Sequence, residues 1–346
     1  MTPINAILLI FLLIAAVAIC ISRHLLASVI IFTAFSIVMS IIWILLAAPD
    51  LALTEAAVST GISGVLFFVV LKRIRVMEIE LHGVEWWKYR HKFKTGKQGF
   101  RYFYYALSAI VTLSLTGILL YTASVLPPFG ESTNPTNNEV SRKYIEEGVQ
   151  DTGAINLVAG MILDYRAFDT FGEACVLLAA ACAILILLRG DAALDPFDAF
   201  LKEMEEPRQN IILKNMAFVL VAMIMIFGCY VILNGHLSPG GGFSGGAILG
   251  ASLVLYASAY GTKRAYTFIN YKIYCRIMSV SLIFYALAKG YSIYSGANYI
   301  KSVIPLGRPG YLFSAGLILP LNISVGLIVA STLYVIYILF SKGELK

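Results

Sequence analysis

The stretch "INAILLIFLLIAAVAICI", from Ile4 to Ile21, contains no charged residue. A helix needs about 20 apolar residues to cross the hydrocarbon core of a bilayer, so this stretch predicts a membrane span. The composition agrees, because the 346 residues are 59% hydrophobic and only 13% charged, whereas soluble domains carry about 25% charged residues. The sequence therefore predicts an integral membrane protein and excludes a soluble enzyme built around a core. No Lys or Arg precedes residue 23, so we expect a retained span, not a signal peptide.

Other stretches of the chain are also long and apolar enough to be spans. The predicted spans are Ile4–Ile21, Leu25–Ala48, Leu51–Leu71, Tyr104–Leu126, Ala174–Leu188, Ile211–Leu233, Gly245–Tyr260, Ile277–Tyr294 and Asn322–Phe340. The fifth and seventh are short and are expected to extend by a few residues. The apolar stretch Ile155–Tyr165 is too short to cross, so it is predicted to lie at the surface or to be re-entrant. The expected fold is an all-α integral membrane protein with about nine transmembrane helices plus one short re-entrant or surface helix.

The basic residues predict the orientation of these spans. With the N-terminus outside, most of the 26 Lys and Arg residues fall in inner segments, as the positive-inside rule requires. Counting Ile155–Tyr165 as another span would move the later basic loops outside. The sequence thus predicts a multi-pass protein of the cell membrane with a cytoplasmic C-terminus. The net charge of +6 reflects this topology, so no nucleic-acid partner is expected.

Composition divides the chain into three predicted blocks, with boundaries at residues 1–101, 102–200 and 201–346. The first block is a three-span bundle that ends in a basic loop, where Trp86, Trp87 and Tyr89 suit the headgroup level. The second holds two spans and a long outer loop rich in turn residues. An acidic inner linker, 189–210, leads to a third block of four spans.

No catalytic or cofactor site is predicted from the sequence. None of the five cysteines forms a CxxC pair, and all lie in or beside apolar runs, which indicates buried thiols and argues against a disulfide framework, zinc or an iron–sulfur cluster. The four histidines do not cluster, and no nucleophile–base set is present. We therefore expect a non-catalytic subunit that binds no cofactor.

Glu55, in "TEAAVSTGISG" (Thr54 to Gly64), is the first candidate site residue. In a membrane helix an acid costs about 2.5–3.5 kcal/mol at the bilayer centre, which favours a role or a partner. In an α-helix Glu55, Ser59 and Ser63 would stack on one face. Beside them, small residues at 52, 56, 59 and 63 would suit close packing against another helix. Two interpretations remain open at this point: a proton or cation path, and a structural acid bonded to a neighbouring helix.

A second candidate is "DYRAFDTFGE", where Asp164, Asp169 and Glu173 lie within ten residues of one another. Asp169 or Thr170 could cap the following helix, with Glu173 completing a capping box. Capping does not explain Asp164 or the neighbouring Arg166. Three acids and one Arg at a membrane boundary could equally hold or funnel a cation, so both interpretations stay open.

The third candidate is "NGHLSPGGGFSGG", Asn234 to Gly246. Its consecutive glycines, Gly240, Gly241 and Gly242, allow an irregular backbone, which is tolerated at membrane depth only where protein or a water cavity covers it. A phosphate-binding loop is excluded because no Lys follows the last Gly. Spacing by four residues predicts that Gly242, Gly246 and Gly250 form a flat face for helix packing. His236 could relay protons, although a structural role is the more common one for a lone loop histidine.

Two polar residues occur within or at the start of later spans. Lys289 lies roughly a turn and a half from the end of its span, so snorkelling to the outer interface is expected. Pairing of Lys289 with one of the acids is the alternative. Asn322 begins the last predicted span and could cap that helix.

With these motifs quoted, a family resemblance becomes visible. "APDLALTEAAVSTGISGVLFFVVLKR" resembles the three-helix module at the C-terminal part of the large subunit of Mrp-type cation/proton antiporters, a module that is a separate subunit in archaeal membrane-bound hydrogenases. "LDYRAFDTFGEACVLLAAACAILILLR" resembles the small module that follows it. "NGHLSPGGGFSGGAILGASLVLYASAYG" and "LFSAGLILPLNISVGL" resemble the antiporter B subunit. Their order is that of a fusion of three adjacent subunits.

The resemblance implies a subunit of a larger membrane assembly, with other membrane subunits and the lipid bilayer as partners. It implies that Glu55 lies on a proton path, that Asp164, Asp169 and Glu173 form the acidic motif, and that the glycine-rich turn acts with His236. Sodium binding would be transient. The resemblance leaves three functions open: an ion-path subunit of a redox-driven complex such as a hydrogenase or sulfur reductase, a subunit of a free-standing sodium/proton antiporter, and a scaffold without ion traffic. It does not imply transport by this chain alone, because the main transport part of the large subunit is absent from this sequence.

Overall fold

The computed structural model describes residues 3–22, 24–81, 98–128, 130–131, 134–187, 211–300 and 302–342, and within these ranges the regular structure is entirely helical. The predictions made for Trp86, Trp87, Tyr89 and the acidic linker lie outside the described residues. The chain forms two compact units, one of residues 1–73 with 144–346 and one of residues 74–143. Each unit is described by itself.

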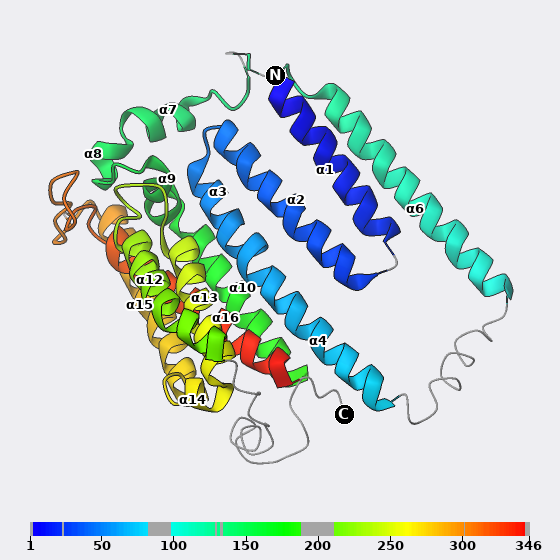
Figure 1. Cartoon of the computed structure of the whole chain (residues 1–346). Coiled ribbons are helices and arrows are strands. Elements are labelled where there is room, and N and C mark those ends of the chain that lie inside the picture. Colours follow the sequence, from blue (N-terminus) through cyan, green and yellow to red (C-terminus); the bar gives the residue numbers. More distant parts are fainter. Residues whose placement is uncertain are drawn as a thin grey trace. The chain divides into compact units, whose positions relative to one another are not determined.

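The first unit begins with α1 (Pro3–Ile21), α2 (Leu25–Leu45) and α3 (Pro49–Glu55). After α3 the chain stays helical through the π-helical segment η1 (Ala56–Ser63) and α4 (Gly64–Leu81), although α4 leaves this unit after residue 73. Pro49 starts α3 because proline fits the first helical turn, where the missing N–H costs no hydrogen bond. Figure 1 shows α1 and α2 as neighbouring antiparallel helices.

The remaining helices complete the two units. The second unit contains α6 (Gln98–Val125). Short helices follow at α7 (Glu139–Glu146), α8 (Gly148–Thr152), α9 (Leu157–Gly160) and the π-helical η2 (Met161–Tyr165). The long helices of the C-terminal part are α10 (Ala167–Leu187), α12 (Ile211–Leu233), α13 (Gly242–Tyr260), α15 (Tyr271–Ala297) and α16 (Ile318–Lys342), with the short α14 at Thr262–Tyr266.

Nine of the described helices are long and apolar enough to cross a membrane, which confirms the predicted fold class. The fifth and seventh spans extend at their N-terminal ends to Ala167–Leu187 and Gly242–Tyr260, as expected. The stretch predicted as a short surface or re-entrant helix is helical from Leu157, as α9 and η2. It contributes no span.

The most closely packed part of the described chain surrounds α13 and α16, which the figure draws side by side (Figure 1). A Cβ atom added to Gly242 would lie 2.6 Å from the carbonyl oxygen of Asn322, and one added to Gly246 would lie 2.7 Å from that of Gly326. Only glycine therefore allows these two backbones to approach so closely. Gly250 continues the face, because its added Cβ would lie 3.2 Å from Leu333 Cβ. The structure thus places the glycines spaced by four residues against α16.

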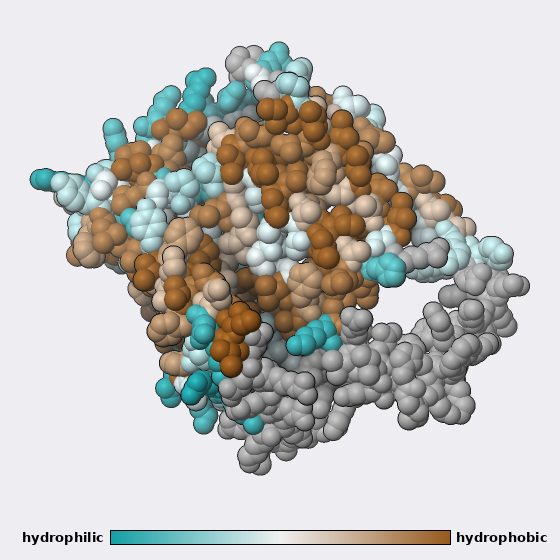
Figure 2. Space-filling view, in the orientation of Figure 1, coloured by the Kyte–Doolittle hydropathy of each residue, from teal (hydrophilic) through white to brown (hydrophobic). Residues whose placement is uncertain are grey.

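By contrast, many apolar side chains of the first two helices are exposed. Along α1 only Leu12 and Ala15 are buried, whereas Ile7, Ile10 and Leu13 are exposed. Figure 2 shows broad hydrophobic areas on the face that it displays. An exposed apolar helix of this length suits a surface that contacts lipid or helices of other subunits.

Candidate functional site

Both acidic candidate regions lie at π-helical segments. Glu55 is the last residue of α3 and directly precedes η1, while Asp164 lies within η2. A π-helix bonds residue i to i+5 and is rare outside short stretches that frequently mark functional sites. The stacking predicted for Glu55, Ser59 and Ser63 assumed α-helical bonds, so η1 changes the register on which that prediction depended. All three side chains are half-buried.

Asp164 and Lys289 form the central ion pair of the candidate site. Lys289 Nζ lies 2.6 Å from Asp164 Oδ1, although the two residues are 125 positions apart in the sequence. The Lys289 side chain is only 5% exposed, whereas that of Asp164 is 37% exposed. The snorkelling expected for Lys289 is therefore wrong, and the alternative of pairing with an acid is correct. The reason is that α15 turns this side chain toward η2, where Asp164 lies.

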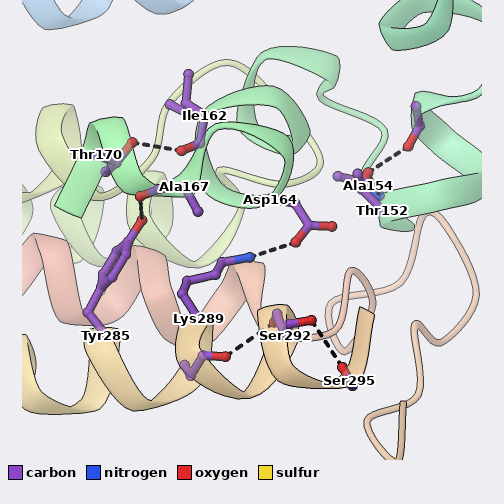
Figure 3. Close-up of polar contacts among 12 residues, drawn as sticks. Thr152, Ala154, Ile162, Asp164, Ala167, Thr170, Tyr285, Lys289, Ser292 and Ser295 are labelled. Carbon is purple, nitrogen blue, oxygen red and sulfur yellow. Dashed lines mark hydrogen bonds and ion pairs between the residues drawn. The ribbon is translucent and has the colours of Figure 1, made fainter. Parts of the chain in front are cut away.

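Two neutral hydrogen bonds position the acidic motif, one from α15 and one between α10 and η2 (Figure 3). The Tyr285 hydroxyl donates a 2.9 Å hydrogen bond to the carbonyl of Ala167, and the ring of Tyr285 stacks on Phe171. The Thr170 hydroxyl donates to the carbonyl of Ile162 at 2.7 Å, inside the same segment. Figure 3 shows Tyr285 and Lys289 projecting from α15 toward the residues of η2 and α10. These contacts fix where the Asp164 carboxylate can lie.

The rest of the acidic motif is arranged differently from the capping prediction. The helix α10 already begins at Ala167, so Asp169 and Thr170 lie inside its first turn and do not cap it. Thr170 donates to a carbonyl and accepts no amide hydrogen. Asp169 instead pairs with Arg166 at 2.6 Å on the exposed surface. Glu173 is exposed in the second turn and makes no hydrogen bond or ion pair within the described ranges.

Among the candidate site residues, Glu55 is the second acid whose side chain has no hydrogen bond or ion pair within the described chain. Its side chain is half-buried. The small-residue stripe beside it is only partly used, because Ala52 is buried while Ala56 is exposed. Directly after η1 the packing becomes close, since a Cβ atom on Gly64 would lie 2.9 Å from Thr33 Cγ2 of α2. Glu55 therefore lies between buried and exposed positions of its helix.

The glycine-rich turn connects α12 to α13 and needs glycine for its backbone. Gly240 has φ +143° and Gly241 has φ +137°, a region that residues with a Cβ rarely adopt. His236, in the same turn, is fully buried. Its Nε2 lies 3.3 Å from the carbonyl oxygen of Tyr311, and its Nδ1 has no hydrogen-bond partner among the described atoms. The buried His236 ring thus has a hydrogen-bond partner at one nitrogen and, among the described atoms, none at the other.

Three residues of the site were missed or misassigned by sequence reasoning. Asn322 lies within α16 and accepts a 2.9 Å hydrogen bond from the Gly242 N–H, so it caps α13 and not its own helix. Asp50 accepts from the Gly240 N–H at 2.9 Å and from Asn156 Nδ2 at 3.0 Å. In the sequence Asp50 resembles an ordinary turn residue. Of these three residues, only Asn156 could have been noticed in the sequence, because Asn is a common N-cap residue and it stands at the start of a helical stretch.

The described contacts join some predicted residues and leave others apart. Asp164 and Lys289 form an ion pair, whereas Glu55 and His236 make no hydrogen bond or ion pair with them.

Next to Asp164, burial and a 2.6 Å hydrogen bond to Asp151 raise the pKa of the Tyr165 hydroxyl above its usual value, so this hydroxyl stays a neutral donor. No group of three or more His, Cys, Asp or Glu side chains suited to a metal ion occurs in the part of the chain that the structure describes.

Comparison with known families gives three consecutive matches. Residues 10–76 match the MbhD family and residues 112–196 match the MbhE family, both of which are described as subunits of MBH. Residues 212–335 match a domain related to the MnhB subunit of Na+/H+ antiporter. The three matches follow one another along the chain without overlap.

Individual relatives agree with these matches. The chain is 24% identical over 263 residues to a probable K(+)/H(+) antiporter A/B subunit of Rhizobium meliloti, which corresponds to 69% of this chain and 24% of the relative. In the solved Mrp complex from Dietzia sp. DQ12-45-1b, one chain superposes with a TM-score of 0.66 at 22% identity, over 97% of this chain and 34% of that chain. A chain of the membrane-bound sulfane sulfur reductase, an archaeal respiratory membrane complex, gives a TM-score of 0.52 at 27% identity, over 67% of this chain and 95% of that chain.

The fold and the matches define a multi-pass, helical, antiporter-like membrane subunit. The matched models describe subunits or a subunit-related domain, and the two similar solved chains come from an Mrp complex and an archaeal respiratory membrane complex. More particularly, the chain is a membrane subunit of the Mrp and MBH type that joins MbhD-, MbhE- and MnhB-like domains in one polypeptide. This confirms the resemblance found in the sequence.

Proposed function

We propose that this chain contributes an ion path to a sodium/proton antiport module, within a redox-driven respiratory complex of the hydrogenase or sulfur reductase kind. The single observation that carries the proposal is Glu55: a half-buried carboxylate at a π-helical segment of a membrane-spanning helix, without a partner in the described chain. Such an acid is costly in a membrane, so water, an ion or another subunit must stabilise it. A group with these surroundings can accept and release a proton.

The polar groups near the other π-helical segment support the same proposal. Lys289 and Asp164 form an ion pair next to Asp169 and Glu173, of which Glu173 has no ion-pair partner in the described ranges. Ionisable residues in membrane segments usually mark ion pathways or proton relays. We assign proton transfer to Glu55 and Glu173 and a buried counter-charge to Lys289. Sodium would bind transiently, and His236 would serve the path from the glycine-rich turn.

The redox-driven setting rests on the likeness to the MbhD and MbhE families and to the sulfane sulfur reductase complex. Redox cofactors would then belong to other chains of the assembly. Purification of the complex from its native membrane tests this part, because iron–sulfur subunits should copurify with the chain. Copurification of antiporter subunits alone would favour a free-standing antiporter instead.

The decisive experiment is Glu55→Gln in the whole complex, reconstituted in vesicles. Sodium-dependent proton movement should fall by about tenfold or more, since a positioned proton-transfer group contributes at least that much to a rate. Glu146→Gln, a change at an exposed acid outside the spans, is the matched control and should leave transport unchanged. Normal transport by an intact Glu55→Gln complex would contradict the proposal and favour a scaffold without ion traffic.

A further inference from the structure

Asp50 and Asn156 both bind the glycine-rich turn from outside it. Asp50 Oδ1 accepts hydrogen bonds from the Gly240 N–H at 2.9 Å and from Asn156 Nδ2 at 3.0 Å. Asn156 Nδ2 also lies 3.1 Å from the carbonyl oxygens of Gly235 and Ser238. One carboxylate and one amide therefore bond the turn at Gly235, Ser238 and Gly240. We call these two side chains and their bonds the Asp50–Asn156 clasp.

The backbone of Asn156 extends the clasp to the buried histidine. The Asn156 N–H donates a 3.0 Å hydrogen bond to the carbonyl of His236. Its side-chain Oδ1 accepts from the N–H groups of Val158 and Ala159, so the same residue caps α9. Nearly every polar group of Asn156 is thus occupied. These hydrogen bonds restrict the Asn156 side chain to one position. Through them Asn156 also restricts the backbone of the turn.

The turn needs such external partners because its backbone is not helical. Gly240 and Gly241 have positive φ values, so they interrupt the helical backbone between α12 and α13, and only the Gly241 carbonyl of this pair accepts a bond from α13, from the Gly245 N–H at 3.0 Å. Glycine also loses more conformational freedom on folding than any other residue, so holding Gly240 and Gly241 in one conformation carries an entropic cost. Backbone groups within a membrane protein must be satisfied internally. The clasp supplies these bonds at one end, and Asn322 supplies one to Gly242 at the other.

The members of the clasp come from different regions of the chain. Asp50 lies in the stretch that matches the MbhD family, and Asn156 lies in the stretch that matches the MbhE family. The turn lies in the stretch related to MnhB. The clasp is therefore a point where all three matched regions are bonded to one another.

We propose that Asp50 and Asn156 are positioning residues: through the clasp they hold the glycine-rich turn, and with it His236, in the geometry on which ion transport depends. Asp50 acts as a hydrogen-bond acceptor and not as a proton or sodium carrier. The structural half of this inference stands on the contacts alone. The transport half rests on the proposed function.

The test compares Asp50→Ala with Asp50→Asn in the whole complex. Hydrogen–deuterium exchange, read by mass spectrometry on peptides covering residues 235–242, should be about tenfold or more faster in Asp50→Ala, because a hydrogen bond to a charged acceptor is lost. Asp50→Asn keeps an oxygen that can accept from Gly240 and Asn156, so exchange should stay near the wild-type rate. Unchanged exchange in Asp50→Ala would overturn the clasp.

A second pair of variants tests the amide. Asn156→Ala should speed exchange in the same peptides as Asp50→Ala. Exchange in the double variant should be little faster than in either single variant, because both substitutions break the same hydrogen-bond network. Asn298→Ala is the matched control, since the Asn298 side chain, just after α15, bonds among the described residues to the carbonyl of Tyr294 alone. Faster exchange at residues 235–242 in this control would show a general loss of stability and would overturn the assignment.

Transport by the same variants separates the inference from the proposed function. Sodium-dependent proton movement should drop severalfold in Asp50→Ala and recover in Asp50→Asn. An Asp50→Asn complex as defective as Asp50→Ala would overturn the positioning role in favour of a charge at this residue. Normal transport by Asp50→Ala with a loosened turn would overturn the link to transport, whereas failure of the proposed function itself is read from Glu55→Gln.

Discussion

Asp164 and Glu55 both lie at π-helical segments, yet within the described ranges only Asp164 has a cationic partner. The Lys289 ammonium, itself buried, lies 2.6 Å from the Asp164 carboxylate. Glu55 is half-buried, and the next residue, Ala56, is exposed. One acid is neutralised inside the chain, and the other is left for water, an ion or another subunit. The comparison teaches that an acid beside a π-helical segment need not be paired within this chain, and that its pairing depends on whether a helix brings a cation to it.

The largest expected loss of stability comes from breaking the ion pair of Asp164 with Lys289. Asp164→Asn leaves the Lys289 ammonium buried without its counter-charge, and such a change in a buried pair costs about 3–5 kcal/mol. Lys289→Met should cost less, because the Asp164 carboxylate that remains is 37% exposed and keeps contact with solvent. Thermal unfolding of the purified complex measures both. Equal losses of stability in the two variants would show that contact with solvent does not stabilise the unpaired Asp164 carboxylate.

Breaking the exposed ion pair of Arg166 and Asp169 should cost less stability than breaking the pair of Asp164 and Lys289. Both side chains are more than half exposed, at 59% and 55%. An exposed pair of this kind contributes about 0.2–1 kcal/mol and is screened by salt. Arg166→Gln should therefore lower stability only slightly, and less at high salt. A loss as large as that of Asp164→Asn would mean that this pair is also structural.

The smallest effect on stability is expected at the second member, Glu55. Since Glu55 makes no hydrogen bond or ion pair in the described part of the chain, Glu55→Gln should change the free energy of unfolding by no more than about 0.5 kcal/mol. The same change should affect transport strongly, as proposed above. Unfolding of the isolated chain in detergent checks the first expectation. A marked loss of stability would place Glu55 with Asp164 among the structural charges.

The apolar runs alone were enough to predict the membrane fold. Each run is long enough for one span, and hydrophobicity acts within a helix whatever lies beside it, so the spans and their order were correct. The start of α10 was missed because Asp169 and Glu173 look like capping residues, yet α10 already begins at Ala167 and Thr170 bonds back to Ile162 in η2. The π-helical segments were not predicted either, since they have no period of their own in the sequence.

The site residues show the same division. Sequence reasoning found Glu55, Asp164, Lys289 and His236 because a polar residue in an apolar stretch is conspicuous. It assigned Lys289 to the interface, since the distance of Lys289 from the end of its span is a local property. It gave no role to Asp50 and Asn156, which resemble ordinary turn and cap residues until the glycine-rich turn lies beside them.

The sequence by itself therefore determined the class of the protein, its spans and the identity of its ionisable residues, because hydrophobicity and charge are properties of each segment. Only the tertiary structure decided that Lys289 pairs with Asp164, that Glu55 has no such partner among the described residues, and that Asp50 and Asn156 bind the glycine-rich turn. The reason is that an ion pair or a hydrogen bond depends on a separation of about 3 Å in space, and residues 106 or 125 positions apart come that close only through helix packing.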